Sequence, residues 1–166
     1  RSTLFPYTTL FRSPYRVGEV VGGGALPDNA GEIQYCDIEI EVAKSGRDAV
    51  NRIKAALERL GAPKGSKLIF EGEGRELPFG VTEGLAIYLN GTDLPDKVYR
   101  ECDSNFVYGE LGRLLEGVGR VLSYWQGPAE TALYLYGKSA AEMKSRIAAF
   151  IASYPLCRKC RIEQIA

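Results

Sequence analysis

Hydrophobic and polar positions in the second half of the chain predict a regular succession of strands and helices. Residues 84–90 form a short apolar run that ends in Asn-Gly, which is typical of a strand leading into a turn. Apolar positions in residues 94–116 recur at helical spacing, with an interruption expected near Ser104. Gly117 and Gly119 are expected to end this helix.

The same half continues with two strands, a helix and a last strand. The two strands are expected within residues 118–136, joined by a Gln-Gly-Pro turn. Ser139, with Glu142 three positions later, is a capping box that begins a helix. A last strand follows at residues 160–165. The order β-α-β-β-α-β is that of the ferredoxin-like split unit, which we therefore predict over residues 84–166.

The first half shows a shorter version of this order. A strand, a second strand, a helix and a third strand are expected, in that order, at residues 16–21, 33–42, 48–60 and 66–71. This β-β-α-β order matches the last four elements of the second half. The sequence therefore predicts an α+β fold with tandem ferredoxin-like (βαββαβ) units, the first truncated to ββαβ. Residues 14–76 form the truncated unit, 77–83 a linker and 84–166 the complete unit.

The first thirteen residues have a different origin from the rest. Residues 1–13 read RSTLFPYTTLFRS and resemble, codon for codon, the translated adapter that is ligated to fragments for short-read DNA sequencing. The resemblance implies an artefact without native function, a natural sequence joined at Pro14, and a true N-terminus that is missing. Segments such as GEVVGGG, GAPKGS and PFGVTEGLAIYLNGTDLPDKVY are similar to small bacterial proteins, and this resemblance implies no activity and no site.

Composition and charge narrow the classes of function. The chain has 21 basic and 21 acidic residues, and removing Arg1 and Arg12 leaves 19 basic residues and a net charge of −2. Because no basic run is present, we expect no nucleic-acid partner. No apolar run reaches ~18 residues, so we expect no membrane partner. His is absent, which removes the commonest general base and zinc ligand. We therefore expect no cofactor, and a non-catalytic protein more readily than an enzyme.

Four scattered cysteines are Cys36, Cys102, Cys157 and Cys160. Their spacing does not suggest a disulfide scaffold, which favours reduced thiols and a cytoplasmic location. Cys157 and Cys160 form a C-x-x-C motif around two basic residues, which leaves metal binding or redox chemistry open. The motif follows a helix instead of opening one, and no second pair of cysteines completes a zinc site. Structural thiols are the preferred interpretation.

An acidic stripe is expected on one strand. Asp37, Glu39 and Glu41 occupy alternate positions, so they share one face of the strand at residues 33–42. Three interpretations are open: a solvated outer face, a divalent-cation site, or a docking surface for a basic protein partner. The intervening β-branched residues are expected to be buried under the helix at 48–60: Ile38, Ile40 and Val42.

Two neighbouring strands of the second half carry an apolar and aromatic group. Tyr134 and Tyr136 share one face, and Leu133 and Leu135 share the other, so this strand is apolar on both faces. Core packing explains one face. The other is expected to meet the first unit, a partner chain or a ligand. The candidate binding residues of this region are Tyr124, Trp125, Leu133 and Leu135.

Three classes of function follow. The favoured one is a non-catalytic protein-binding module, similar in kind to immunity proteins that block toxins, which uses the acidic stripe. The second is a small-molecule regulatory domain whose ligand lies between paired units, lined by the glycine-rich segment 22–24 and the Tyr/Trp group. That segment lacks the phosphate-loop pattern, which favours a hairpin loop. The third is a Cys-based metal or redox protein. Homo-oligomer formation stays open.

Overall fold

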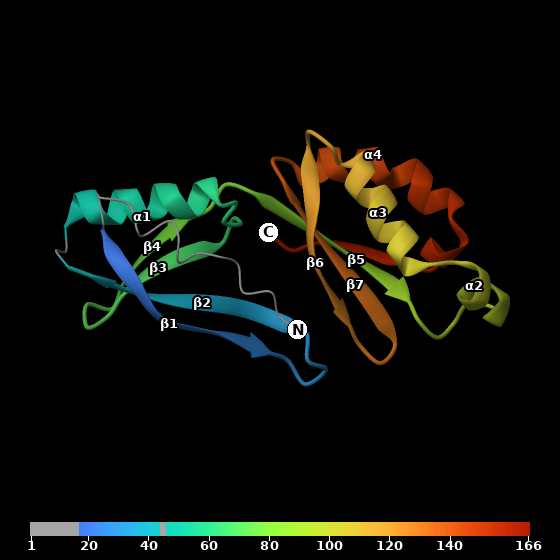
Figure 1. Cartoon of the computed structure of the whole chain (residues 1–166), viewed down its shortest axis with the longest axis horizontal. Coiled ribbons are helices and arrows are strands. Elements are labelled where there is room, and N and C mark those ends of the chain that lie inside the picture. Colours follow the sequence, from blue (N-terminus) through green and yellow to red (C-terminus); the bar gives the residue numbers. More distant parts are fainter. Residues whose placement is uncertain (1–16, 44–45) are drawn as a thin grey trace. The chain divides into compact units, whose positions relative to one another are not determined.

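A computed structural model of the chain describes residues 17–43 and 46–166. The chain divides into two compact units, residues 1–57 and 58–166, each of which is considered by itself (Figure 1). The helices and strands form a mixed set, which confirms the α+β class. The adapter-like segment predicted at residues 1–13 lies outside the described residues.

The elements are numbered in chain order in Figure 1. They are β1 (Gly18–Pro27), β2 (Ile33–Val42), α1 (Arg47–Arg59), β3 (Ser66–Phe70), β4 (Arg75–Phe79), β5 (Glu83–Asn90), α2 (Asp96–Glu101), α3 (Ser104–Leu114), β6 (Gly119–Gln126), β7 (Glu130–Gly137), α4 (Ala140–Ser153), the 3-10 helix η2 (Pro155–Cys157) and β8 (Arg161–Gln164). Across the described residues they form three antiparallel sheets, β1-β2, β3-β4 and β6-β7-β5-β8. The break predicted near Ser104 separates α2 from α3.

The first unit contains a long β-hairpin. β2 has the bounds that its alternation predicts, but β1 continues to Pro27, so the glycine-rich segment predicted as a loop is strand instead. Glycine permits this pairing because the two strands approach closely. A Cβ atom on Gly23 would lie 2.7 Å from the carbonyl oxygen of Asp37. The turn is held by Asp28, whose side chain accepts hydrogen bonds from the backbone N–H groups of Ala30 and Glu32 at 2.8 and 2.9 Å.

A second hairpin, β3–β4, was not expected from the sequence. Residues 77–79, predicted as linker, belong to β4. Pro78 lies opposite Lys67, and a proline is tolerated there because β4 is an edge strand whose outer amides need no partner. Among the described strands, β3 therefore pairs with β4 and not with β1 or β2. β1-β2 and β3-β4 are thus separate two-stranded sheets.

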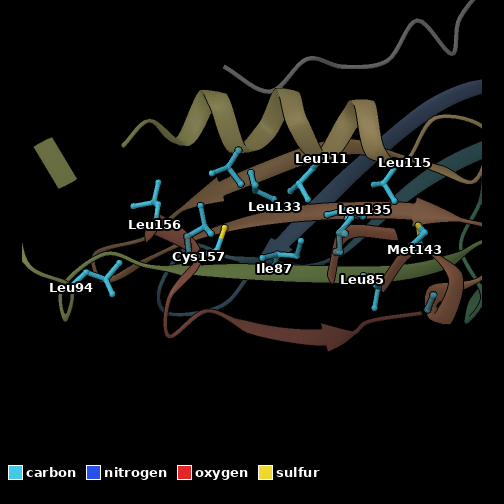
Figure 2. Close-up of a cluster of buried hydrophobic side chains, with 14 residues drawn as sticks. Leu85, Ile87, Leu94, Leu111, Leu115, Leu133, Leu135, Met143, Leu156 and Cys157 are labelled. Atoms are coloured by element: carbon cyan, nitrogen blue, oxygen red, sulfur yellow. The ribbon is translucent and has the colours of Figure 1, made fainter. Parts of the chain in front are cut away.

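The four-stranded sheet of the second unit carries helices on one face. β5, α3, β6, β7, α4 and β8 follow one another along the chain, and the antiparallel order is β6-β7-β5-β8. α3 and α4 lie on the same side of this sheet (Figure 1). Side chains from β5, β7 and these helices form one buried cluster (Figure 2), whose largest fully buried members are Ile87, Val107, Leu111, Leu115, Leu135, Met143 and Ile147.

Candidate binding surfaces

The structure places the acidic stripe where the sequence predicts it. Asp37, Glu39 and Glu41, which we call the acidic face, are all exposed and lie on the same side of β2. Gly24 and Gly22 lie opposite Asp37 and Glu39 on β1, so no β1 side chain stands across from these two carboxylates. Opposite Glu41, β1 contributes a further acidic residue, Glu19. The hairpin therefore presents negative charge along one side.

Among the described residues, several carboxylates of the second unit form ion pairs, whereas those of the acidic face do not. Within residues 17–43 and 46–166, none of its three carboxylates forms an ion pair. In the second unit, by contrast, Glu110 binds Arg113 at 2.6 Å and Glu76 binds Lys67 at 2.8 Å. The hydrogen bond from Arg113 lowers the pKa of Glu110. The charge of the acidic face is thus not compensated within the described chain.

The opposite side of β2 is less buried than its alternation predicts. Ile38 is 40% exposed, so the expectation that it is buried is wrong, and Ile40 and Val42 are only half-buried. The physical reason is that β1 and β2 form a two-stranded sheet, which by itself has no second layer. Ile53 is the one apolar side chain that is buried in the described part of the first unit. The hairpin is therefore open to solvent over most of its length.

Apolar side chains are exposed at the tip of the hairpin. Tyr35 is 59% exposed, and Ile33 and Leu26 are exposed as well. Tyr35 and Ile33 lie on the same side of β2 as the acidic face, and Leu26 is directly opposite Tyr35 on β1. An apolar tip therefore adjoins the acidic face. Exposed apolar side chains beside charged ones are typical of an interaction surface.

Leu133 and Leu135 do not belong to a binding surface, and this prediction is wrong. They are 3% and 0% exposed. Figure 2 shows both side chains pointing from β7 into the cluster below α3, where Leu111 and Leu115 lie. Alternation shows that the two leucines share a face, but it does not show which face the helices cover. A buried leucine under a helix cannot contact a partner without unfolding.

The predicted aromatic group is divided between the two sides of the sheet. Tyr124 and Trp125 follow one another on β6, so they point to opposite faces. Tyr124 is 66% exposed. Trp125 packs with Tyr134 against a small cluster on the face away from the helices: Ala86, Tyr88 and Ala132. Gly127 lies directly against the Trp125 ring and leaves no room there for a Cβ atom.

An arginine on β8 crosses this same face and was not predicted. The guanidinium carbon of Arg161 lies 3.3 Å from the ring centroid of Tyr88 on β5. Its nitrogens donate to both carboxylate oxygens of Glu130 at 2.9 and 3.2 Å, and a further one donates to Glu163. The hydrogen bond with Arg161 lowers the pKa of Glu130, and the pKa of Arg161 is raised. Arg161 therefore connects β5, β7 and β8 and has a structural role.

The C-x-x-C motif forms a turn in which Cys157 is buried and Cys160 is half-buried, while the two basic residues between them are exposed. The N–H of Cys160 donates to the carbonyl of Cys157 at 3.2 Å, and Lys159 between them has a φ of 59°. Burial raises the pKa of Cys157 to about 12 and also raises the pKa of Cys160. The reactive or metal-binding form of cysteine is the thiolate, which burial disfavours here. In the part of the chain that the structure describes, no three His, Cys, Asp or Glu side chains are grouped to hold a metal ion.

Comparisons with protein-family models, with curated proteins and with solved structures found no match. Among the helices of the described segments, none combines the length and the apolar composition needed to cross a bilayer. The acidic face with its apolar tip is an exposed surface whose three carboxylates form no ion pair among the described residues.

Proposed function

We propose that this chain is a non-catalytic protein-binding module whose acidic face docks a basic protein partner. The observation that carries the proposal is the row of three exposed carboxylates, Asp37, Glu39 and Glu41, with no ion pair in the described residues. Alternate residues of a strand lie about 7 Å apart. A partner with cations at the same spacing would complement each carboxylate.

The size of the charge effects indicates what the acidic face contributes. Two like charges about 7 Å apart in water repel by about 0.6 kcal/mol, which the folded chain tolerates. Each exposed ion pair with a partner would contribute roughly 0.2–1 kcal/mol. Three such pairs therefore guide the encounter and select a basic partner more than they create affinity. The adjoining apolar side chains at the tip, Leu26, Ile33 and Tyr35, would supply buried area on binding.

A binding role without catalysis is supported by where the shifted pKa values occur. The pKa of Glu110 is lowered by its ion pair with Arg113, and that of Cys157 is raised by burial. The ion pair and the burial both belong to the packing of the fold, so neither pKa shift indicates a catalytic group. Immunity proteins that block toxins are one class of module with this role, and we include that class by analogy. All four cysteines are free, which supports a reducing, cytoplasmic setting.

The tandem of two ferredoxin-like units belongs to the same proposal, with residues 14–76 as a truncated unit and 84–166 as a complete one. The order β1-β2-α1-β3 supports it because it repeats the order β6-β7-α4-β8. In the second unit β8 pairs with the opening strand, β5. A unit without its opening strand leaves β3 without that partner, and β3 pairs with β4 instead. NMR contacts between β3 and β1 would contradict the tandem, because it places β1 at the far edge.

Reversal of charge on the acidic face tests the proposed function. The Asp37→Lys/Glu39→Lys chain should keep its fold, since exposed charge changes rarely cost more than ~0.5 kcal/mol. It should associate more slowly with a fluorescein-labelled lysine-rich peptide, and its association rate should depend less on salt. Stopped-flow anisotropy at several salt concentrations measures the rate, and the NMR amide chemical shifts of β1 and β2 check that the hairpin keeps its fold.

A matched control keeps the net charge equal. The Glu71→Lys/Glu116→Lys chain carries the same charge change at two exposed residues of the second unit, outside β1 and β2. It should bind the peptide nearly as fast as the unchanged chain. Equal slowing of both double variants would show that only net charge matters, and it would remove the acidic face as a docking surface.

A further inference from the structure

The two cysteines of the C-x-x-C motif lie at the ends of a type II β-turn. Arg158 has a φ of −62° and a ψ of 139°, and Lys159 has a φ of 59°. These angles and the hydrogen bond from the N–H of Cys160 to the carbonyl of Cys157 are characteristic of this turn. The first and fourth Cα atoms of a β-turn lie within about 7 Å, and a disulfide bridges Cα atoms about 4.4–6.8 Å apart. The backbone therefore holds both cysteines within reach of a disulfide bond.

The turn keeps this form with backbone strain. The third position of a type II turn has a positive φ and ordinarily carries glycine, but here it carries Lys159. Among the described residues other than glycine, Lys159 alone has a positive φ. The Lys159 ammonium donates to the carbonyl of Asp93 at 3.0 Å, and Cys157 is buried in the cluster that Figure 2 shows. Strain that the surrounding contacts maintain at one point of a fold indicates that the local geometry has a role.

The two thiols differ in their access to solvent. Cys157 is 3% exposed, whereas Cys160 is half-buried. Burial, followed by the neighbouring thiols of Cys160 and Cys102, raises the pKa of Cys157 to about 12. Burial disfavours a thiolate because the thiolate is charged, but a disulfide has no charge and fits an apolar cluster. The pair is therefore suited to form a buried disulfide slowly, and not to exchange disulfides rapidly as a catalyst.

We propose that Cys157 and Cys160 form a reversible disulfide bond that fastens the start of β8. The oxidant is a small disulfide of the glutathione type. The thiolate of Cys160, the more accessible of the two, attacks one sulfur of this small disulfide and releases one small thiolate. The thiolate of Cys157 then attacks the Cys160 sulfur and releases the second small thiolate. The chain thereby loses two electrons and two protons, and the small disulfide is reduced to two thiols.

The bond would act on a short edge strand. β8 pairs with β5 alone among the described strands. Its first residue, Arg161, follows Cys160 directly and contacts Tyr88 and Glu130. A disulfide across the turn restricts the chain just before Arg161, so it opposes local opening of β8. The reduced and oxidised forms would share one fold and differ in how often β8 separates from β5. This device lies in the second unit and does not depend on the acidic face.

Redox equilibration of the whole chain tests the bond. The Cys36→Ser chain, which lacks the exposed thiol, is incubated with equal millimolar concentrations of reduced and oxidised glutathione. It is then quenched in acid, and its remaining thiols are alkylated in denaturant. Mass spectrometry of its peptides should show that most of the chain carries the Cys157–Cys160 disulfide and an alkylated Cys102. With either partner replaced by serine, the remaining cysteine should form at most a mixed disulfide with glutathione.

Two substitutions at Lys159 test whether the turn prepares the bond. Lys159→Gly supplies a residue that accepts a positive φ, so its disulfide should form at least as readily. Lys159→Val places a β-branched side chain at this φ, so the ratio of disulfide to dithiol should fall about tenfold. The NMR amide chemical shifts of β5 and β7 check that both variants keep the sheet. Equal ratios in the two variants would contradict the proposed dependence on the turn.

Hydrogen exchange of the reduced and oxidised chains tests the effect on β8. Amides of β8 should exchange about tenfold more slowly in the oxidised chain. Amides of β6, at the other edge of the same sheet, should exchange alike in both forms. A mixed disulfide on Cys160 alone, or a bond between Cys102 and Cys157, would overturn the proposed bond. Equal exchange of β8 in the two forms would overturn its role in fastening the strand.

Discussion

Glu83 is a residue whose charge holds two separate segments of the second unit. One carboxylate oxygen accepts from Lys64 at 2.5 Å, and the other accepts from the backbone N–H of Ala140 at 2.7 Å, at the start of α4. The hydrogen bond from Lys64, followed by that from Ala140, lowers the pKa of Glu83. A lowered pKa stabilises the fold above the carboxyl's usual pKa, and this stabilisation is lost as the pH falls through the lowered value.

The prediction at this scale is that Glu83→Gln destabilises the chain near neutral pH and has little effect in acid. At about pH 7 the variant lacks a charge that the unchanged chain uses, whereas in acid below its lowered pKa Glu83 itself becomes protonated. Urea unfolding followed by Trp125 fluorescence measures the difference at each pH. Glu76→Gln is the control, because the exposed Lys67–Glu76 pair should contribute little at any pH. A deficit for Glu83→Gln that does not change with pH would contradict this role.

At the scale of the element, α4 depends on the cap at its first turn. The Oγ of Ser139 accepts from the backbone N–H of Glu142 at 3.2 Å, as the capping box predicts. Ser139→Ala should lower the free energy of unfolding by about 1 kcal/mol. Ser145→Ala, on the exposed side of α4, should leave it unchanged or slightly raised because alanine favours helix. Urea unfolding compares the two. Equal effects would mean that the contact from Glu83 to Ala140 is sufficient to hold the helix end.

At the scale of the whole molecule, apolar burial is unequal between the two units. All buried apolar side chains of the described residues except Ile53 belong to residues 58–166. A two-stranded hairpin alone is marginally stable in water. We therefore expect amides of β1 and β2 to exchange with deuterium much faster than those of β5 and β7, by local opening while the second unit stays folded. Mass spectrometry of peptides from the exchanged chain measures this. Similar protection in both regions would show that the chain opens as one cooperative unit.

Local patterns predicted many elements because their causes are local. The bounds of β2 follow from strict alternation, the break between α2 and α3 was expected near Ser104, and the N-terminus of α4 was expected at Ser139. The predictions were wrong where the extent or existence of a strand depends on how it pairs with another strand. β1 is longer than predicted because its glycines allow β2 to approach closely and pair with them. β4 was missed because the tolerance of Pro78 depends on its place at an edge.

The candidate sites show the same division. Alternation by itself determined that Asp37, Glu39 and Glu41 share a face and that Leu133 and Leu135 share another, since a strand turns its side chains to opposite sides with a period of two. Only the tertiary structure decided that α3 and α4 cover the two leucines, while the acidic face stays open. Only the register of β5, β7 and β8 brings Arg161 over Tyr88 and onto Glu130. These residues are far apart along the chain, and their contacts depend on which strands pair and in which alignment.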